Sequence, residues 1–498
     1  MCRTLFFLCA LSSLCTEARA QADERPIKQP SPAQSAEATA TAPPFLALGP
    51  RLETELFLRA PLFVSDAKEG NVGMTVSLTL ASDLHQAVSS GLRHGFQLGG
   101  NPWVEVLVGW PTVTAVQFAL ATVSGLAVPR SSWAHEEFHR AVLAHNDILT
   151  TRNEVFEFKG ADVDSALYVS NVSDEDLAAF KQRSAAHYSR MSSAGLEGQT
   201  ELIRAIERDQ FFLAKTGAQL GPVWVAKAWN APTLWLNAIN TWGYMSTCAS
   251  QDSVERTESI ESADGEDVLA RDFTGFDCNA WVYDIHRPDE PYEDRGAHPS
   301  GVGIDRARHF DDLSPDEQAY LQLSAGLSAL NFIDPNLLGI NGFTFALGDV
   351  QMRSNARLVH HMAPFGNTVA LDAVLVADWL GLNAQLIAYG TRDAILPGVS
   401  IDLVRLPLSL SPWPGLWERT AVHASMRTMG WLQPAGLRFD GRDGFLPGGL
   451  VEVELGVFPL PALEVFVGLG IKSEGFVAAR VELEPAIFGQ AGLSVAVY

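Results

Sequence analysis

The pattern of apolar and polar residues changes once along the chain, close to residue 342. Between residues 82 and 332, apolar residues recur mostly at helical spacing, with Gly and Pro clusters between the runs. After residue 342 they recur at every second position, which is typical of strands. We therefore predict an α+β fold, in which a helical core precedes an antiparallel β-rich region that forms a sandwich or a barrel. The predicted strands are 355–361, 368–378, 383–389, 399–406, 420–429, 450–457, 462–470, 476–483 and 493–498.

Two local signals add detail to the helical region. Residues 53–58 and 74–80 alternate between apolar and polar, which predicts short strands ahead of the helices. Ser314-Pro315-Asp316-Glu317 combines an N-cap residue, a proline at the first helical position and a capping-box glutamate. This motif predicts a helix that begins at Pro315.

The N-terminal residues are typical of an export signal. Arg3 precedes an apolar run at residues 5–15, and Ala18-Arg19-Ala20 has the small-x-small form of a cleavage site. We therefore predict export to the periplasm or the outer membrane of a Gram-negative bacterium. The predicted parts are a signal peptide (1–20), a disordered linker (21–46), a mainly helical domain with short N-terminal strands (47–342) and an antiparallel β domain (343–498).

Composition limits the classes of partner. The chain has 498 residues, of which 47% are hydrophobic and 19% charged, as in globular proteins. Its formal net charge of -23 argues against a nucleic-acid partner. Cys248 and Cys278 are the cysteines outside the signal peptide, and we predict that they form a disulfide. Acidic residues, Asp277 among them, crowd the segment between these cysteines, and we expect a solvated loop there.

The strongest motif is His135-Glu136-Glu137-Phe138-His139, which has the HExxH pattern. On a helix the two histidines lie four residues apart on one face, so both imidazoles can reach one Zn2+. Glu136 follows the first histidine and is placed to act as the general base toward water.

These five residues resemble the zinc-binding helix of the zincin metallopeptidases, and the resemblance is limited to this helix and one further ligand. It implies that His135 and His139 bind zinc, that Glu136 is the base, and that a third protein residue completes the site. The implied substrate is a peptide or protein.

Two residues compete as the third ligand. Glu197 is similar to the glutamate of the gluzincin branch, and Gly195 and Gly198 would let two helices approach closely. His145 has the spacing of the metzincin branch, but Val142 stands where that branch has a glycine. A continuing helix would then carry His145 away from the ion, so we favour Glu197. Asp147 and Glu201 are further alternatives.

The sequence therefore predicts an exported zinc-dependent metallopeptidase, in which Glu136 acts on a zinc-activated water. His187 and Tyr188 are candidate oxyanion donors, although a surface pair is the more common role of such residues. The alternative from another class is an outer-membrane β-barrel with a structural or transport role, in which the HEEFH helix is not catalytic.

The membrane question rests on two further features. Tyr498 ends the chain with an aromatic residue, as barrel strands often do, but the large apolar residues near it lie on the opposite face. Residues 106–128 carry no charge and are long enough to span a bilayer. Gly, Pro and hydroxyl residues in this run favour a buried core helix, and a membrane-proximal peptidase is the alternative.

Overall fold

In the computed structural model of the chain, the described residues are 54, 56–68, 70–96, 131–152, 169–213, 219–220, 223–225, 231–250, 275–298, 301–377, 380–408, 421–460 and 462–497, with isolated positions at 104, 108, 111, 112 and 115. The predicted signal peptide and linker lie outside these residues. So do most of the uncharged run at 106–128, most of the acidic segment and Tyr498.

The described α-helices lie in the N-terminal two thirds of the chain. The α-helices are α2 (Gly73–Phe96), α5 (Ser131–His145), α6 (Asp174–Arg183), α7 (Ala185–Phe212), α8 (Ala231–Cys248), α10 (Asp277–His286) and α11 (Pro315–Ser328). The 3-10 helices are η3 (Tyr292–Arg295), η4 (Phe310–Asp312), η5 (Ala329–Phe332), η6 (Pro335–Leu338) and η7 (Ala435–Leu437). Within the described residues, every helix is too short or too polar for a membrane crossing.

The strand predicted at residues 74–80 is wrong, because these residues form the beginning of α2. The hydroxyls of Ser77 and Thr79 each donate a hydrogen bond to a backbone carbonyl one turn earlier, at 2.7 and 2.9 Å. Their side chains are therefore satisfied within the helix, and α2 packs against α5 and α7. Tertiary packing has overridden an alternating pattern here.

The strands form one antiparallel twelve-stranded sheet in the order β1-β14-β13-β12-β11-β10-β9-β8-β7-β6-β5-β4, and a separate pair, β2-β3. The edges are β1 and β4, so the described sheet is open, and the predicted α+β fold is confirmed. The strands are β1 (Leu56–Val64), β2 (Thr151–Arg152), β3 (Val169–Ser170), β4 (Gln219–Leu220), β5 (Val223–Val225), β6 (Ile340–Leu347), β7 (Val350–Ala363), β8 (Gly366–Val376), β9 (Gly381–Gly390), β10 (Ile395–Leu408), β11 (Ala421–Pro434), β12 (Phe445–Leu460), β13 (Leu463–Lys472) and β14 (Ala486–Val497).

One predicted strand is instead a connection. Residues 476–483 belong to the segment between β13 and β14. The backbone N–H of Ala479 in this segment donates a hydrogen bond to Glu197 of α7. Phe476 and Val481 are each 1% exposed there, so their apolar character reflects burial in a loop. This explains why the pattern resembled a strand.

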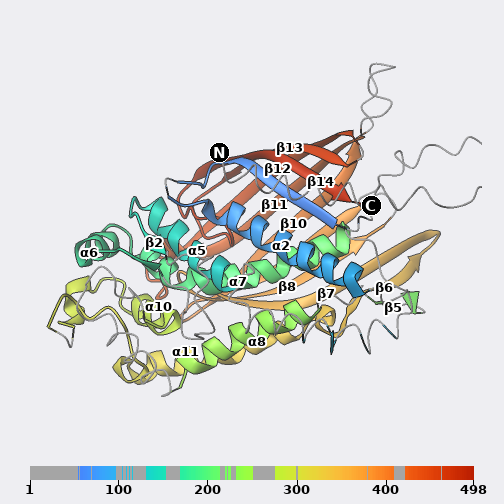
Figure 1. The fold of residues 1–498 in the computed structure, drawn as a ribbon. Helices are drawn as coiled ribbons and strands as arrows, with labels where there is room; N and C mark the ends of the chain where they lie inside the picture. The colour runs from blue at the N-terminus through green and yellow to red at the C-terminus, as the bar shows by residue number, and fades with distance from the viewer. Residues whose placement is uncertain are drawn as a thin grey trace, which may run out of the picture. The chain divides into compact units, whose positions relative to one another are not determined.

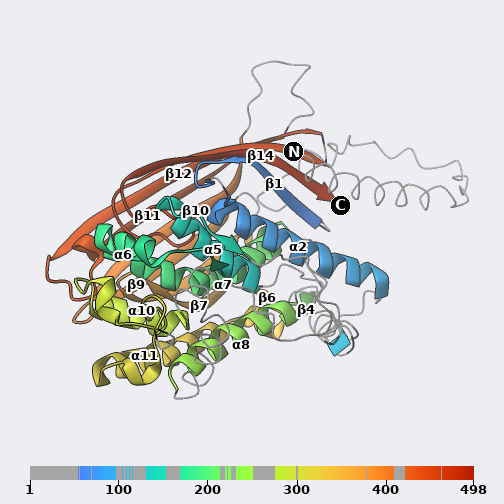
Figure 2. The ribbon, with the colours of Figure 1, turned by 60° about the vertical axis from the view of Figure 1, so that its left-hand side comes forward.

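Helix α7 is central to the packing, with α2 and α5 beside it on the same face of the sheet (Figures 1 and 2). Phe211 and Phe212 at its end join a buried cluster with Phe57 of β1, Val404 of β10 and Phe458 of β12. At Gly198 of α7, a Cβ would lie 2.8 Å from the ring of Phe138 of α5. The small residue lets α5 and α7 approach closely, as expected from the sequence, and this places the HEEFH motif against α7.

Candidate metal centre

The HEEFH motif lies on α5, whose other face is anchored in the core. Phe138 and Val142 are fully buried in the cluster that α5 shares with α7. Glu137 accepts hydrogen bonds from Asn71 and Arg140, at 3.2 and 2.7 Å, and so has a structural role. The core contacts fix the rotation of α5 and direct both histidines of the motif toward one point.

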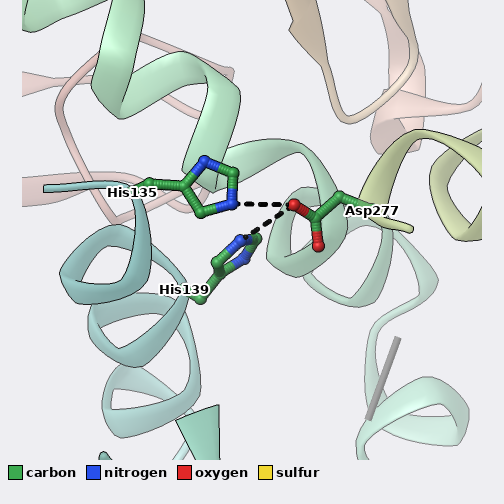
Figure 3. A group of neighbouring side chains, drawn as sticks. All are labelled: His135, His139 and Asp277. Carbon is green, nitrogen blue, oxygen red and sulfur yellow. Dashed lines mark hydrogen bonds and ion pairs between the residues drawn. The ribbon is translucent and has the colours of Figure 1, made fainter. Parts of the chain in front are cut away.

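Three side chains converge at that point (Figure 3). The Nε2 atom of His135 lies 2.8 Å from Oδ2 of Asp277, and the Nε2 atom of His139 lies 3.3 Å from the same oxygen. All three residues are buried, and their ligand atoms lie within 4.8 Å of one another. Two imidazoles and one carboxylate are a common ligand set for zinc in hydrolytic sites.

A neighbouring backbone carbonyl fixes the orientation of one imidazole. Nδ1 of His139 lies 2.5 Å from the carbonyl oxygen of Met191, so Nδ1 carries the proton and donates it. The other nitrogen, Nε2, then faces Asp277. Metal-binding histidines usually have such a partner on their second nitrogen, because it sets the tautomer and the ring orientation.

Gly195 of α7 leaves space for an ion. A Cβ at this position would lie 2.4 Å from the Nε2 atoms of both His135 and His139. A zinc ion lies about 2.0–2.1 Å from each of its nitrogen ligands. The hydrogen of Gly195 therefore leaves open the volume beside both nitrogens, and the three side chains fit a small divalent cation.

The charges of the three groups depend on one another. Burial by itself raises the pKa of Asp277, but the charge of His139 and the hydrogen bonds from both imidazoles hold it well below its usual range. Burial lowers the pKa of His139, yet Asp277 and then Glu136 outweigh this effect and raise it to about 9. For His135, burial outweighs the bond to Asp277 and lowers the pKa. The metal-free group thus pairs a carboxylate with one imidazolium.

Asp277 is not among the ligands that the sequence predicts, and the solvated loop expected at this position is wrong for Asp277. The residue is 4% exposed and lies in the first turn of α10. The hydroxyl of Tyr244, on α8, donates to its Oδ2 at 3.2 Å. The predicted disulfide is present and joins Cys248, at the end of α8, to Cys278. No local sequence pattern marks Asp277 as a ligand, because it reaches His135 across 142 positions through tertiary packing.

Glu136, the candidate general base, lies beside this group. Its Oε1 is 4.0 Å from Nε2 of His135, and its side chain is 15% exposed. It is the more accessible carboxylate of the two near the histidines, because the Asp277 side chain is 6% exposed. A water molecule at the centre could therefore lie within reach of Glu136.

Glu197, the favoured third ligand, has other partners. It accepts hydrogen bonds from the Arg190 guanidinium at 2.9 Å and from the backbone N–H of Ala479 at 2.7 Å. Burial outweighs both contacts and raises its pKa to about 7. Asp277, and not Glu197, completes the group with the histidines, because tertiary packing turns Glu197 toward the loop after β13.

The remaining predicted site residues lie elsewhere. His145 and His187 flank the half-exposed Glu484, with Nε2-to-carboxylate distances of 2.8 and 3.4 Å. They form a second group of potential ligands, separate from the first. Tyr188 is 1% exposed and packs against Phe180. The structure therefore brings neither His145 nor the two oxyanion candidates to the His135/His139/Asp277 centre.

Comparisons of the chain with protein families, curated proteins and solved structures gave no match. The resemblance to zincins thus remains confined to the HEEFH helix. What the geometry adds is a buried candidate metal centre of two histidines and one aspartate.

Proposed function

We propose that the protein is a zinc-dependent hydrolase in which His135, His139 and Asp277 hold the ion. The observation that carries the proposal is the convergence of these three side chains at the position where Gly195 lacks a Cβ. When bound, zinc would supply a Lewis acid that polarises the scissile carbonyl and lowers the pKa of the attacking water. The resemblance of the helix to zincins supports a peptide bond as the bond that is cleaved.

Residues of the chain would transfer the proton and position the candidate ligands. Glu136 accepts a proton from water and passes it to the leaving amine, which its partial exposure and its distance of 4.0 Å from Nε2 of His135 support. Tyr244 positions Asp277 through its hydroxyl, and Met191 positions His139 through its carbonyl. Both contacts hold ligands in place, so the ion would meet a preorganised site.

Hydrolysis of an unfolded protein substrate by the purified exported chain tests this role of Glu136. Glu136→Gln is expected to keep the metal and to lose about 100-fold or more of the activity, as is usual when a general base is removed. Glu175→Gln, on the exposed surface of α6, is the matched control and should keep full activity. Full activity of Glu136→Gln would contradict the assignment.

A further inference from the structure

One face of the sheet is exposed and apolar, whereas charged residues lie on the face that is buried against the helices. On β13 the outward residues Val465, Val467, Leu469 and Ile471 are 45%, 49%, 66% and 57% exposed. The alternate positions, which include Glu464 and Lys472, point inward and are buried. In a water-facing antiparallel sheet the exposed positions are normally polar.

The neighbouring strands also expose apolar residues on this face. Exposed outward residues include Val399 and Ile401 of β10, Val451, Val453 and Leu455 of β12, and Leu493 of β14. In the described parts of β8–β14, no outward position carries a charged side chain. We call these outward positions the outer face; α2, α5 and α7 lie on the opposite side of the sheet (Figure 2).

The charges of these strands gather on the inner side. Glu454 pairs with Arg59 at 2.7 Å, and Glu452 pairs with Arg480 at 2.7 Å. Asp372 of β8 lies 3.2 Å from Arg204 of α7. These side chains line a cavity of about 310 Å³ between the sheet and the helices. A polar interior behind an apolar exterior is the arrangement that a hydrocarbon environment favours.

The dimensions of the strands suit a bilayer. Each of β8–β14 has between 10 and 16 residues, and a tilted strand needs about 9–11 residues to cross the hydrocarbon core. From Leu463 to Ile471 the outer face of β13 extends about 26 Å at about 3.3 Å per residue. Each of these strands also pairs with a neighbour on both sides, so hydrocarbon against this face would meet paired backbone groups.

We propose that the outer face of β8–β14 contacts the hydrocarbon of a lipid bilayer. The outer face carries no charged residue among its described positions on these seven adjoining strands. This favours lipid over a second copy of the chain, because protein interfaces have polar rims around their apolar centres. This proposal is independent of the metal centre, and it applies equally to the hydrolase and to the structural or transport alternative.

Fluorescence quenching in vesicles tests it. The mature chain carrying Leu469→Cys, labelled with a small fluorophore, is reconstituted into phosphatidylcholine vesicles with nitroxide groups on the acyl chains. The control is Leu323→Cys on α11, which is similarly exposed at 53% against 66%. We expect nitroxide lipid to quench the probe at 469 at least threefold more than the probe at 323, and aqueous iodide to show the reverse order.

Two outcomes would overturn the proposal. The first is iodide quenching at 469 that equals the quenching at 323, which would place the outer face in water. The second is protection of 469 from both quenchers in a chain that sediments as a dimer, which would make a second copy the occupant. The tryptophan spectrum and the intact Cys248–Cys278 disulfide report folding of each labelled chain.

Discussion

Gly195 leaves space at the candidate metal centre because it has no side chain. A Cβ at this position would lie 2.4 Å from the Nε2 atoms of both His135 and His139. If the proposed centre holds an ion beside these nitrogens, a methyl group at position 195 would compete with the ion for the same space. The proposal therefore makes Gly195 as necessary for metal binding as the candidate ligands.

Gly195→Ala should accordingly lose at least 90% of the bound zinc. Gly243→Ala is the matched control, because Gly243 lies on α8 one residue from Tyr244 and a Cβ there meets nothing within 4 Å. The control should retain the metal of the unmodified protein. Metal analysis after dialysis measures both variants, and a Gly195→Ala protein with a full equivalent of zinc would show that the ion lies elsewhere.

Metal binding should release protons. The pKa of His139 is raised to about 9 in the metal-free group, so its Nε2 is protonated at pH 7 and must lose that proton to bind zinc. We expect His139 to release about one proton per ion at pH 7, and zinc to bind more weakly as the pH falls. Calorimetry in two buffers of different ionisation enthalpy measures the number. A binding enthalpy that does not depend on the buffer would contradict this electrostatic account.

The residues of the centre differ in how far sequence could reveal them. His135, Glu136 and His139 were predictable because helical spacing alone places them together. Asp277 lies 142 positions from His135 and reaches it through the packing of α10 against α7. Glu197 fitted the spacing expected of a third ligand. Its carboxylate instead forms an ion pair with Arg190, which lies two turns earlier on the same helix. Tertiary contacts, which no local pattern encodes, decided both cases.

At the level of elements, a covalent link supports the ligand set. The Cys248–Cys278 disulfide joins the end of α8 to the first turn of α10, and these helices carry Tyr244 and Asp277. The link therefore holds the third candidate ligand and its hydrogen-bond partner together. It also suits the predicted export, since disulfides persist mainly outside the cytoplasm.

Removing this link should weaken the centre as well as the fold. The double variant Cys248→Ala/Cys278→Ala is expected to lose about 3–4 kcal/mol of unfolding free energy, from the closure of a loop of 30 residues. Zinc affinity should fall about tenfold or more, because Asp277 then loses its fixed position. Denaturant titration and competition with a chelator measure the two effects. Unchanged zinc affinity in the folded variant would show that α10 is held without the bridge.

Some elements followed from local chemistry and others did not. The helix at Pro315 begins as predicted, because Ser314 and Glu317 form a capping box that is complete within four residues. Residues 74–80 show the opposite case: their alternation suggested a strand, yet burial against α5 and α7 selected a helix. A helix cap depends on residues that are close in sequence. Whether an ambiguous apolar segment forms a helix or a strand depends on the elements that pack against it.

For the whole molecule, the sequence predicted the order of a helical part and an antiparallel sheet but not how they combine. β1 lies near the start of the described residues and pairs with β14, which lies near their end. The charged inner side of the sheet then faces the helices, and the apolar positions of β8–β14 face outward. Alternation along each strand was visible in the sequence, but which face met the helices was not, because period two is the same in both orientations.

The zinc content of the purified protein tests the central claim most directly, when it is measured for the unmodified protein, Asp277→Asn and Glu197→Gln. Both substitutions remove one buried carboxylate and keep its shape. The account predicts one equivalent of zinc in the unmodified protein and in Glu197→Gln, and less than a tenth of that in Asp277→Asn. Zinc retained in folded Asp277→Asn and lost in Glu197→Gln would contradict the ligand set, and no zinc in the unmodified protein would contradict the metal centre itself.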